Sequence, residues 1–81
     1  MLTALEDLAA RLGVEVRREF TETAGGLFSL KGRRFVLIAA DAGLDEQIEV
    51  LAAALASLNT EDVYVVPAVR DLLDDYTSEE R

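Results

Sequence analysis

An apolar helix is the sequence feature that most constrains the fold. Leucine and isoleucine recur over residues 44–58 at alternating steps of four and three, which is the spacing of one helical face. The last charged residue of this segment is Glu49, and residues 50–58 carry no charge on any side. Because a helix that is apolar all round is normally buried on several sides, we predict that it is the central packing element. Leu51 and Leu55 lie mid-stripe and are predicted to be almost fully buried.

A β-hairpin is predicted directly before this helix. Two apolar runs are joined either by Lys31-Gly32 or by Gly32-Arg33, and glycine supplies the positive φ that a tight hairpin turn needs. Both alternatives place the same residues together. One face would carry Phe28, Leu30, Phe35 and Leu37, and the other Leu27, Ser29, Val36 and Ile38.

Weaker signals mark the other elements. Thr3 and Glu6 form a capping-box pattern at the start of a first helix, and Gly13 is placed to end it. Residues 14–20 alternate like a strand with one buried face, in which Arg18 is out of pattern. We expect a loop over residues 21–25, and either a short strand or an extended linker over residues 63–66. Pro67 suits the first position of a last helix.

The predicted fold is a single α+β domain over residues 1–76, in the order α-β-β-β-α-(β)-α. Its three strands would form an antiparallel sheet packed with three helices, and residues 77–81 would be a disordered tail. Both faces of the predicted hairpin are largely apolar, so two arrangements stay open. Either one helix layer covers one face and leaves the other exposed, or the first and last helices cover opposite faces.

Composition limits the chemistry that the chain can perform. It has no cysteine and no histidine, so the usual thiol nucleophiles, catalytic bases and zinc ligands are missing. We therefore expect no enzyme, no catalytic residue, no metal and no cofactor, and an enzyme that uses carboxylates and arginines is the remaining alternative. The net charge of −8 opposes nucleic-acid binding. The apolar run is shorter than the about 20 residues that span a bilayer. With no signal segment visible, we expect a cytoplasmic protein.

Charge is distributed unevenly along the chain. Residues 1–40 carry a net charge of +1 and residues 41–81 a net charge of −9. This asymmetry either serves solubility or creates a basic edge that meets an acidic partner, a second copy of the chain included. The basic residues of the strand region are Arg17, Arg18, Lys31, Arg33 and Arg34.

The central part of the chain resembles a known family. Gly26-Leu27, the run from Phe35 to Ile38, the short loop after it, and residues 45–55 are similar to the core of the minimal ImmA/IrrE-like zinc metallopeptidases. In that family a strand pair leads into a helix that carries the motif HExxH. The matching positions in this chain are Ala53, Ala54 and Ser57. Since none of them can bind zinc or act as the general base, the resemblance implies a catalytically inactive relative that keeps the scaffold.

The predicted function is that of a small, non-catalytic protein-interaction module that associates with itself as a homodimer. The alternative is a regulatory or small-ligand-binding domain on an inactive peptidase-like scaffold. The predicted interface combines apolar surface from the hairpin and the central helix with basic charge. Its candidate residues are Leu27, Val36, Ile38, Val50, Ala54, Arg33 and Arg34.

Overall fold

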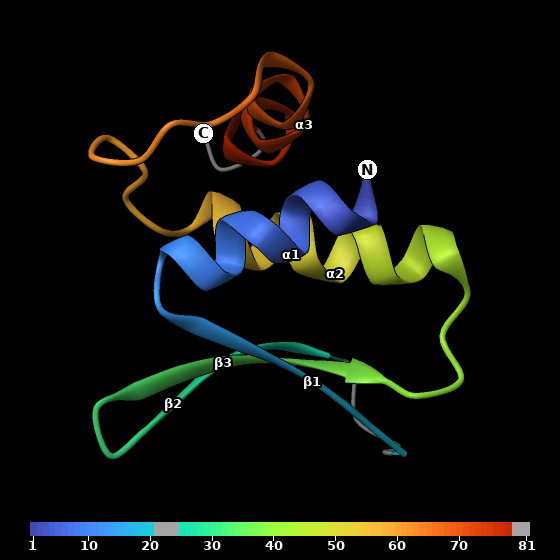
Figure 1. Ribbon diagram of the computed structural model, residues 1–81. Helices are drawn as coiled ribbons and strands as arrows, with labels where there is room; N and C mark the ends of the chain where they lie inside the picture. Colours follow the sequence, from blue (N-terminus) through green and yellow to red (C-terminus); the bar gives the residue numbers. More distant parts are fainter. Residues whose placement is uncertain (21–24, 79–81) are drawn as a thin grey trace.

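Three helices and a three-stranded sheet build the fold (Figure 1). The structure is a computed structural model that describes residues 1–20 and 25–78. The predicted α+β class, with three strands and three helices, is confirmed. In chain order the elements are α1 (Leu2–Arg11), β1 (Val14–Glu19), β2 (Gly26–Leu30), β3 (Arg33–Ala39), α2 (Leu44–Ala56) and α3 (Pro67–Ser78).

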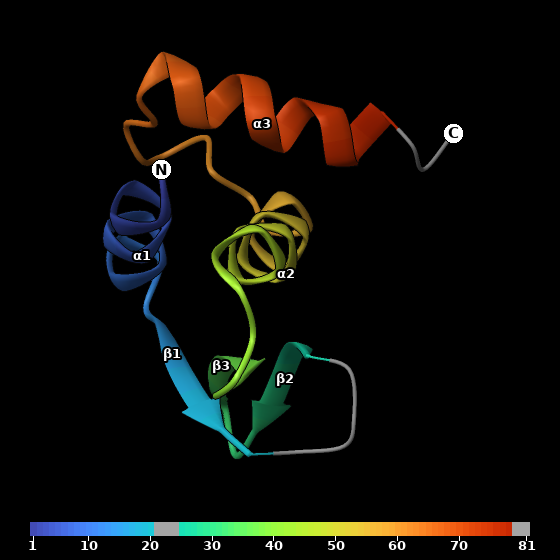
Figure 2. The same ribbon diagram turned by 90° about the vertical axis from the view of Figure 1, so that its right-hand side faces the viewer.

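The sheet is mixed, with the strand order β1-β3-β2. β2 and β3 pair antiparallel with Phe28 opposite Phe35, whereas β1 and β3 pair parallel with Val16 beside Val36. The prediction of a wholly antiparallel sheet is therefore wrong for β1. β1 and β2 do run in opposite directions, as neighbours in a meander would, but β3 lies between them (Figure 2).

The turn between β2 and β3 is the one that the glycine predicted. Lys31 has a φ of 52° and Gly32 a φ of 79°. Positive φ at both central residues is typical of the type I′ turn, whose twist matches that of the two strands it joins. The two-residue loop is therefore Lys31-Gly32, and the predicted division of the hairpin into two faces is confirmed by the pairing of Leu27 with Val36.

The helices form two layers on one side of the sheet. α1 and α2 lie side by side across the sheet, and α3 lies on the far side of them (Figures 1 and 2). α2 is thus enclosed by β2 and β3, by α1 and by α3. This position explains why the second half of α2 needs no charged side. The predicted burial of Leu51 and Leu55 is confirmed, because both side chains are 0% exposed.

α1 and α2 cover one face of the sheet. This is the face that carries Leu27, Val36 and Ile38 of the predicted interface. Val36 and Ile38 are both 0% exposed, and Ala54 is 6% exposed. The prediction that these three residues belong to an interface is wrong, because they form the core of the single chain. The arrangement with the first and last helices on opposite faces is wrong as well, since α3 packs on α2.

The ends of the elements also differ from the prediction. α1 begins at Leu2 with Met1 as its N-cap and no side-chain cap bond, so the predicted capping box is wrong. Gly13 does follow the helix in the expected left-handed conformation, with a φ of 74°. α3 runs through residue 78, which places the first two residues of the predicted tail in a helix. The rest of that tail, residues 79–81, lies outside the described residues, and so do residues 21–24 of the predicted loop. Residues 63–66 contain no strand.

Candidate functional site

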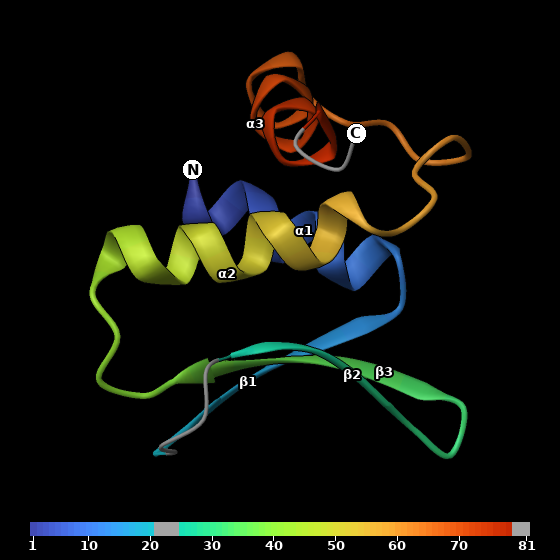
Figure 3. The same ribbon diagram turned by 180° about the vertical axis from the view of Figure 1, so that it is seen from behind.

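The second face of the sheet, opposite the helices, is left uncovered by the described helices. No helix of residues 1–20 and 25–78 lies over it (Figures 1 and 3). Its residues alternate with the buried ones along each strand, as the pleat requires. We call this surface the open face. By strand it carries Glu15, Arg17 and Glu19 from β1, Gly26, Phe28 and Leu30 from β2, and Arg33, Phe35, Leu37 and Ala39 from β3.

An aromatic pair forms the centre of the open face. The rings of Phe28 and Phe35 stack with their centroids 5.7 Å apart and their planes at 25°. The guanidinium carbon of Arg17 lies 4.7 Å from the centroid of Phe35, and its Nε atom lies 2.7 Å from Oε2 of Glu15. A cation over an aromatic ring contributes about 0.5–1 kcal/mol at an exposed site. These contacts bring an arginine and two aromatic rings together on the surface.

Apolar exposure on this face is concentrated rather than scattered. Phe28 is 43% exposed and Leu30 is 62% exposed, and Phe35 and Leu37 beside them are half-buried. Single exposed apolar residues are common on any protein surface. A contiguous patch is more informative, because such patches mark surfaces that bind other molecules. The open face is therefore the strongest candidate for an interaction surface.

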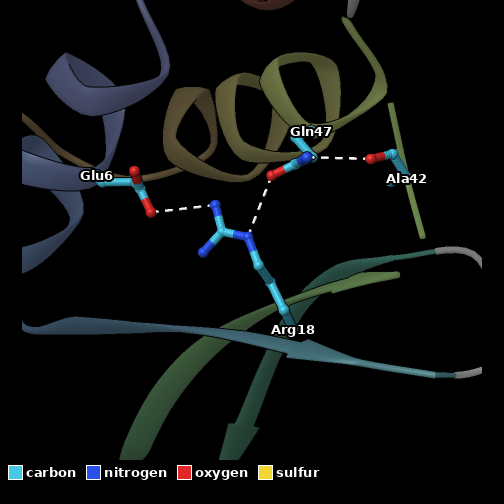
Figure 4. Close-up of polar contacts among 4 residues, drawn as sticks. All are labelled: Glu6, Arg18, Ala42 and Gln47. Carbon is cyan, nitrogen blue, oxygen red and sulfur yellow. Dashed lines mark hydrogen bonds and ion pairs between the residues drawn. The ribbon is translucent and has the colours of Figure 1, made fainter. Parts of the chain in front are cut away.

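Arg18, which the strand pattern could not explain, has a structural role on the covered side of the sheet (Figure 4). Its Nη2 atom lies 3.1 Å from Oε2 of Glu6 on α1, and its Nε atom donates a 3.1 Å hydrogen bond to Oε1 of Gln47 on α2. The amide nitrogen of Gln47 in turn donates to the carbonyl oxygen of Ala42. Arg18 therefore ties β1 to both covering helices at the rim of the core.

A groove runs beside the start of β2, between that strand and α2. Its volume is about 580 Å³. We call it the α2 groove. Its lining comes from the start of β2, from one side of α2 and from Tyr76 of α3, and the other residues are Gly25, Gly26, Leu27, Glu49, Val50, Ala53, Ala54 and Ser57.

The α2 groove contains all three positions that the family resemblance would assign to zinc chemistry. Ala53 and Ala54 present methyl groups there, and the hydroxyl of Ser57 donates a 2.7 Å hydrogen bond to the carbonyl oxygen of Ala54. Within residues 1–20 and 25–78, no group of three histidine, cysteine or acidic side chains is placed to hold a metal ion. The groove is accordingly a mostly apolar hollow, with Glu49, Ser57 and Tyr76 as the polar residues of its lining.

The remaining predicted interface residues are divided between separate surfaces. Leu27 and Val50 are half-buried in the α2 groove. Arg33 lies on the open face. Arg34 points to the other side and donates a 3.2 Å hydrogen bond from Nη2 to the carbonyl oxygen of Leu12. The seven residues therefore do not form one surface.

The predicted interface did not include five residues of the open face, namely Phe28, Leu30, Phe35, Leu37 and Arg17. A usable signal was present in β1. Three of its four charged residues, Glu15, Arg17 and Glu19, fall on one side, which favours that side as the one that faces solvent. Once β1 is placed next to β3 with Glu15 beside Phe35, the exposed side of the hairpin is determined.

Comparisons with family models, curated proteins and solved structures found no match. Among the described helices, none combines the length and the hydropathy that crossing a membrane requires.

Proposed function

We propose that this chain is a non-catalytic protein-interaction module whose binding surface is the open face and whose partner is a second copy of itself. The observation that carries the proposal is the ordered aromatic pair, Phe28 on Phe35, exposed at the centre of an uncovered sheet face. Aromatic and arginine side chains are enriched where proteins bind one another, and this face has both.

Self-association is favoured because the open face carries its own complement. Its apolar residues lie on β2 and β3, and β1 presents both signs of charge next to them, with Glu15 and Arg17 already paired. A two-fold dimer brings the same patch of each copy together, so a surface with both charges and a central apolar block suits it. Both copies contribute the same residues to such a contact, so it needs no second type of partner.

The size of the sheet limits the affinity. Three strands spaced about 4.8 Å apart, each about six residues long at about 3.3 Å per residue, cover roughly 300 Å². Stable complexes typically bury about 800 Å² on each partner. The dimer is therefore expected to be weak, unlike an obligate dimer.

The proposal assigns no catalysis to this surface. The chain has neither histidine nor cysteine, and the charged side chains of the open face lie on the uncovered, solvent-exposed side of the sheet. Catalytic acids and bases act in enclosed sites that exclude water and shift their pKa values. Binding is the activity that such a face supports.

The experiment that tests the proposal is sedimentation equilibrium from about 1 μM to about 1 mM, a range that brackets weak affinities. The natural chain should move from its 8.8 kDa monomer mass towards twice that mass. The variant Phe28→Glu should remain a folded monomer over the same range. Tyr64→Glu is the matched control, because Tyr64 is 70% exposed but lies beside α1, where it lines a pocket with Asp7 and Arg11. A natural chain that remains monomeric at about 1 mM would overturn the proposal.

The α2 groove supports a second candidate, a domain that binds a small apolar ligand on an inactive peptidase-like scaffold. The supporting observation is that Ala53, Ala54 and Ser57 line one hollow together with Gly25 and Gly26. Ala53→Phe would fill this hollow from an exposed helix position. If the groove is a binding site, apolar fragments should shift NMR signals of its lining residues in the natural chain and not in this variant. Signals that shift equally in both would contradict this candidate.

A further inference from the structure

We propose that the two copies pack open face to open face with their strands antiparallel, about a two-fold axis that crosses β3 at right angles between Phe35 and Leu37. This inference rests on the proposed function and adds the geometry of the dimer and the residues that meet across it. It follows from the order of residues on the open face, which the strand register defines.

The open face consists of four rows that run across the strands. The register places Leu30 beside Arg33 at the hairpin end, and Ala39 beside Glu19 at the opposite end. Between them lie two rows of three residues. One is Phe28, Phe35 and Glu15, and the other is Gly26, Leu37 and Arg17.

A two-fold axis in the plane of contact leaves the strands of the two sheets aligned in only two cases: when it runs at right angles to the strands, or when it runs along them. With the axis at right angles to the strands, each strand lies over the same strand of the partner subunit and runs in the opposite direction. An axis along the strands keeps the direction but exchanges β1 with β2. Two packed sheets either keep their strand directions within about 30° of each other or cross at nearly a right angle, and we propose the aligned class, which brings whole strands of the open face together.

The axis at right angles to the strands matches large residues with small ones. It sets the row of Phe28 over the row of Gly26 of the partner subunit. A Cβ atom built at Gly26 would meet no atom within 4 Å, so the surface there is open and can receive an aromatic ring. Phe35 then lies over Leu37 of the partner subunit, and the two-fold repeats both contacts.

The same axis also matches charges. Glu15 lies over Arg17 of the partner subunit, so the 2.7 Å ion pair within each chain is extended across the dimer. At the ends, Arg33 lies over the row that contains Glu19 of the partner subunit. Opposite charges across an interface give specificity and fix its register.

The other axis creates conflicts at the same positions. With strands parallel, Arg33 would lie over its own copy, and Phe28 would lie over Glu15 of the partner subunit. Like charges placed opposite one another are unfavourable, and so is an aromatic ring over a carboxylate that must lose its water. The antiparallel arrangement is therefore the one that these residues favour.

Crosslinking of single-cysteine variants tests the orientation, because the natural chain has no cysteine and each introduced thiol is unique. We choose Arg33→Cys and Ala39→Cys and a thiol-specific crosslinker matched to the about 10 Å spacing of packed sheets. In the antiparallel dimer, residue 33 of one copy faces residue 39 of the other. Two copies of residue 33 lie about 20 Å apart, the length of six residues. A 1:1 mixture should therefore give a crosslinked product of twice the monomer mass, several-fold above either variant alone.

The outcomes separate the two proposals. Efficient crosslinking of Arg33→Cys alone would show parallel strands and overturn the orientation, while the dimer itself would stand. Absence of crosslinking in the mixture, with sedimentation showing dimers of both variants, would place the contact elsewhere and overturn the orientation too. A chain that sedimentation finds monomeric throughout would overturn the proposed function first. Tyr64→Cys serves as the background control in every case.

Discussion

Gly25 lies so close to β3 that a Cβ atom at this position would overlap the carbonyl oxygen of Leu37. The same atom would lie 3.1 Å from Cγ1 of Val50 on α2. Glycine is therefore required where the chain enters β2 between the sheet and the central helix. Its neighbour Gly26 has open space around it. Two adjacent glycines thus have opposite tolerance for a side chain.

The first prediction compares alanine at these two glycines. Gly25→Ala should lower the free energy of unfolding by about 1–3 kcal/mol, because a backbone oxygen cannot move aside as a flexible side chain can. Gly26→Ala should be neutral or raise it by about 0.4–1 kcal/mol, since alanine restricts the unfolded chain. Urea denaturation measures both. Equal effects of the two substitutions would contradict the close approach at Gly25.

The second prediction concerns the link from Arg18 to α1 and α2. The side chains of Arg18 and Glu6 are each 36% exposed, so water screens their attraction. Replacing Arg18 with methionine keeps its apolar stem and should cost no more than about 1 kcal/mol of stability. Arg18→Glu should cost more, because it sets a like charge beside Glu6.

A double-mutant cycle isolates the ion pair in that prediction. Arg18→Met, Glu6→Gln and the combined variant should give a coupling energy of about 0.2–1 kcal/mol that falls when salt is raised to about 1 M. A coupling above about 2 kcal/mol would mean that the pair is far less solvated than its exposure indicates.

The sequence predicted those elements whose signal is local. The positive φ at Lys31 and Gly32 follows from the turn chemistry, and the burial of Leu51 and Leu55 follows from a helix without a charged side. Strand order was not predictable in this way. β1 alternates identically whether it pairs with β2 or with β3, and no short turn fixes its neighbour.

The candidate site was misplaced for a related reason. Each face of the hairpin carries large apolar residues, so composition alone does not decide which face the helices cover. The decision lies in the parallel pairing, which sets Val16 beside the buried Val36 and Arg17 beside Leu37. That pairing is a long-range contact, and a reading of local periodicity does not contain it.

The third prediction tests the central position of α2. Leu55 is fully buried between the sheet and α3, so Leu55→Ala should lower the free energy of unfolding by about 2–5 kcal/mol. That is a large fraction of the about 5–15 kcal/mol total for typical domains. Leu44→Ala is the matched control on the same helix, because Leu44 is largely exposed. Similar losses for both leucines would contradict the layered packing.

The fourth prediction is that the protein purified without chelator holds no tightly bound zinc. Alanine at positions 53 and 54 and serine at position 57 offer no ligand of the kind that zinc prefers. Elemental analysis of the purified chain measures the zinc content. Ala53→His combined with Ser57→His places two imidazoles four residues apart and serves as a positive control for metal uptake. One zinc ion per natural chain would contradict the prediction.

The last prediction contrasts the two faces of the sheet with the same substitution. Ile38 is fully enclosed beneath α1 and α2, so Ile38→Glu places a carboxylate in the core with no partner, and the protein should unfold. Phe28→Glu places the same group on the open face, where water reaches it, and the fold should persist while association is lost. Circular dichroism reports the fold and sedimentation reports the mass. A folded monomer from Ile38→Glu, together with an unfolded Phe28→Glu, would mean that the helices cover the opposite face of the sheet.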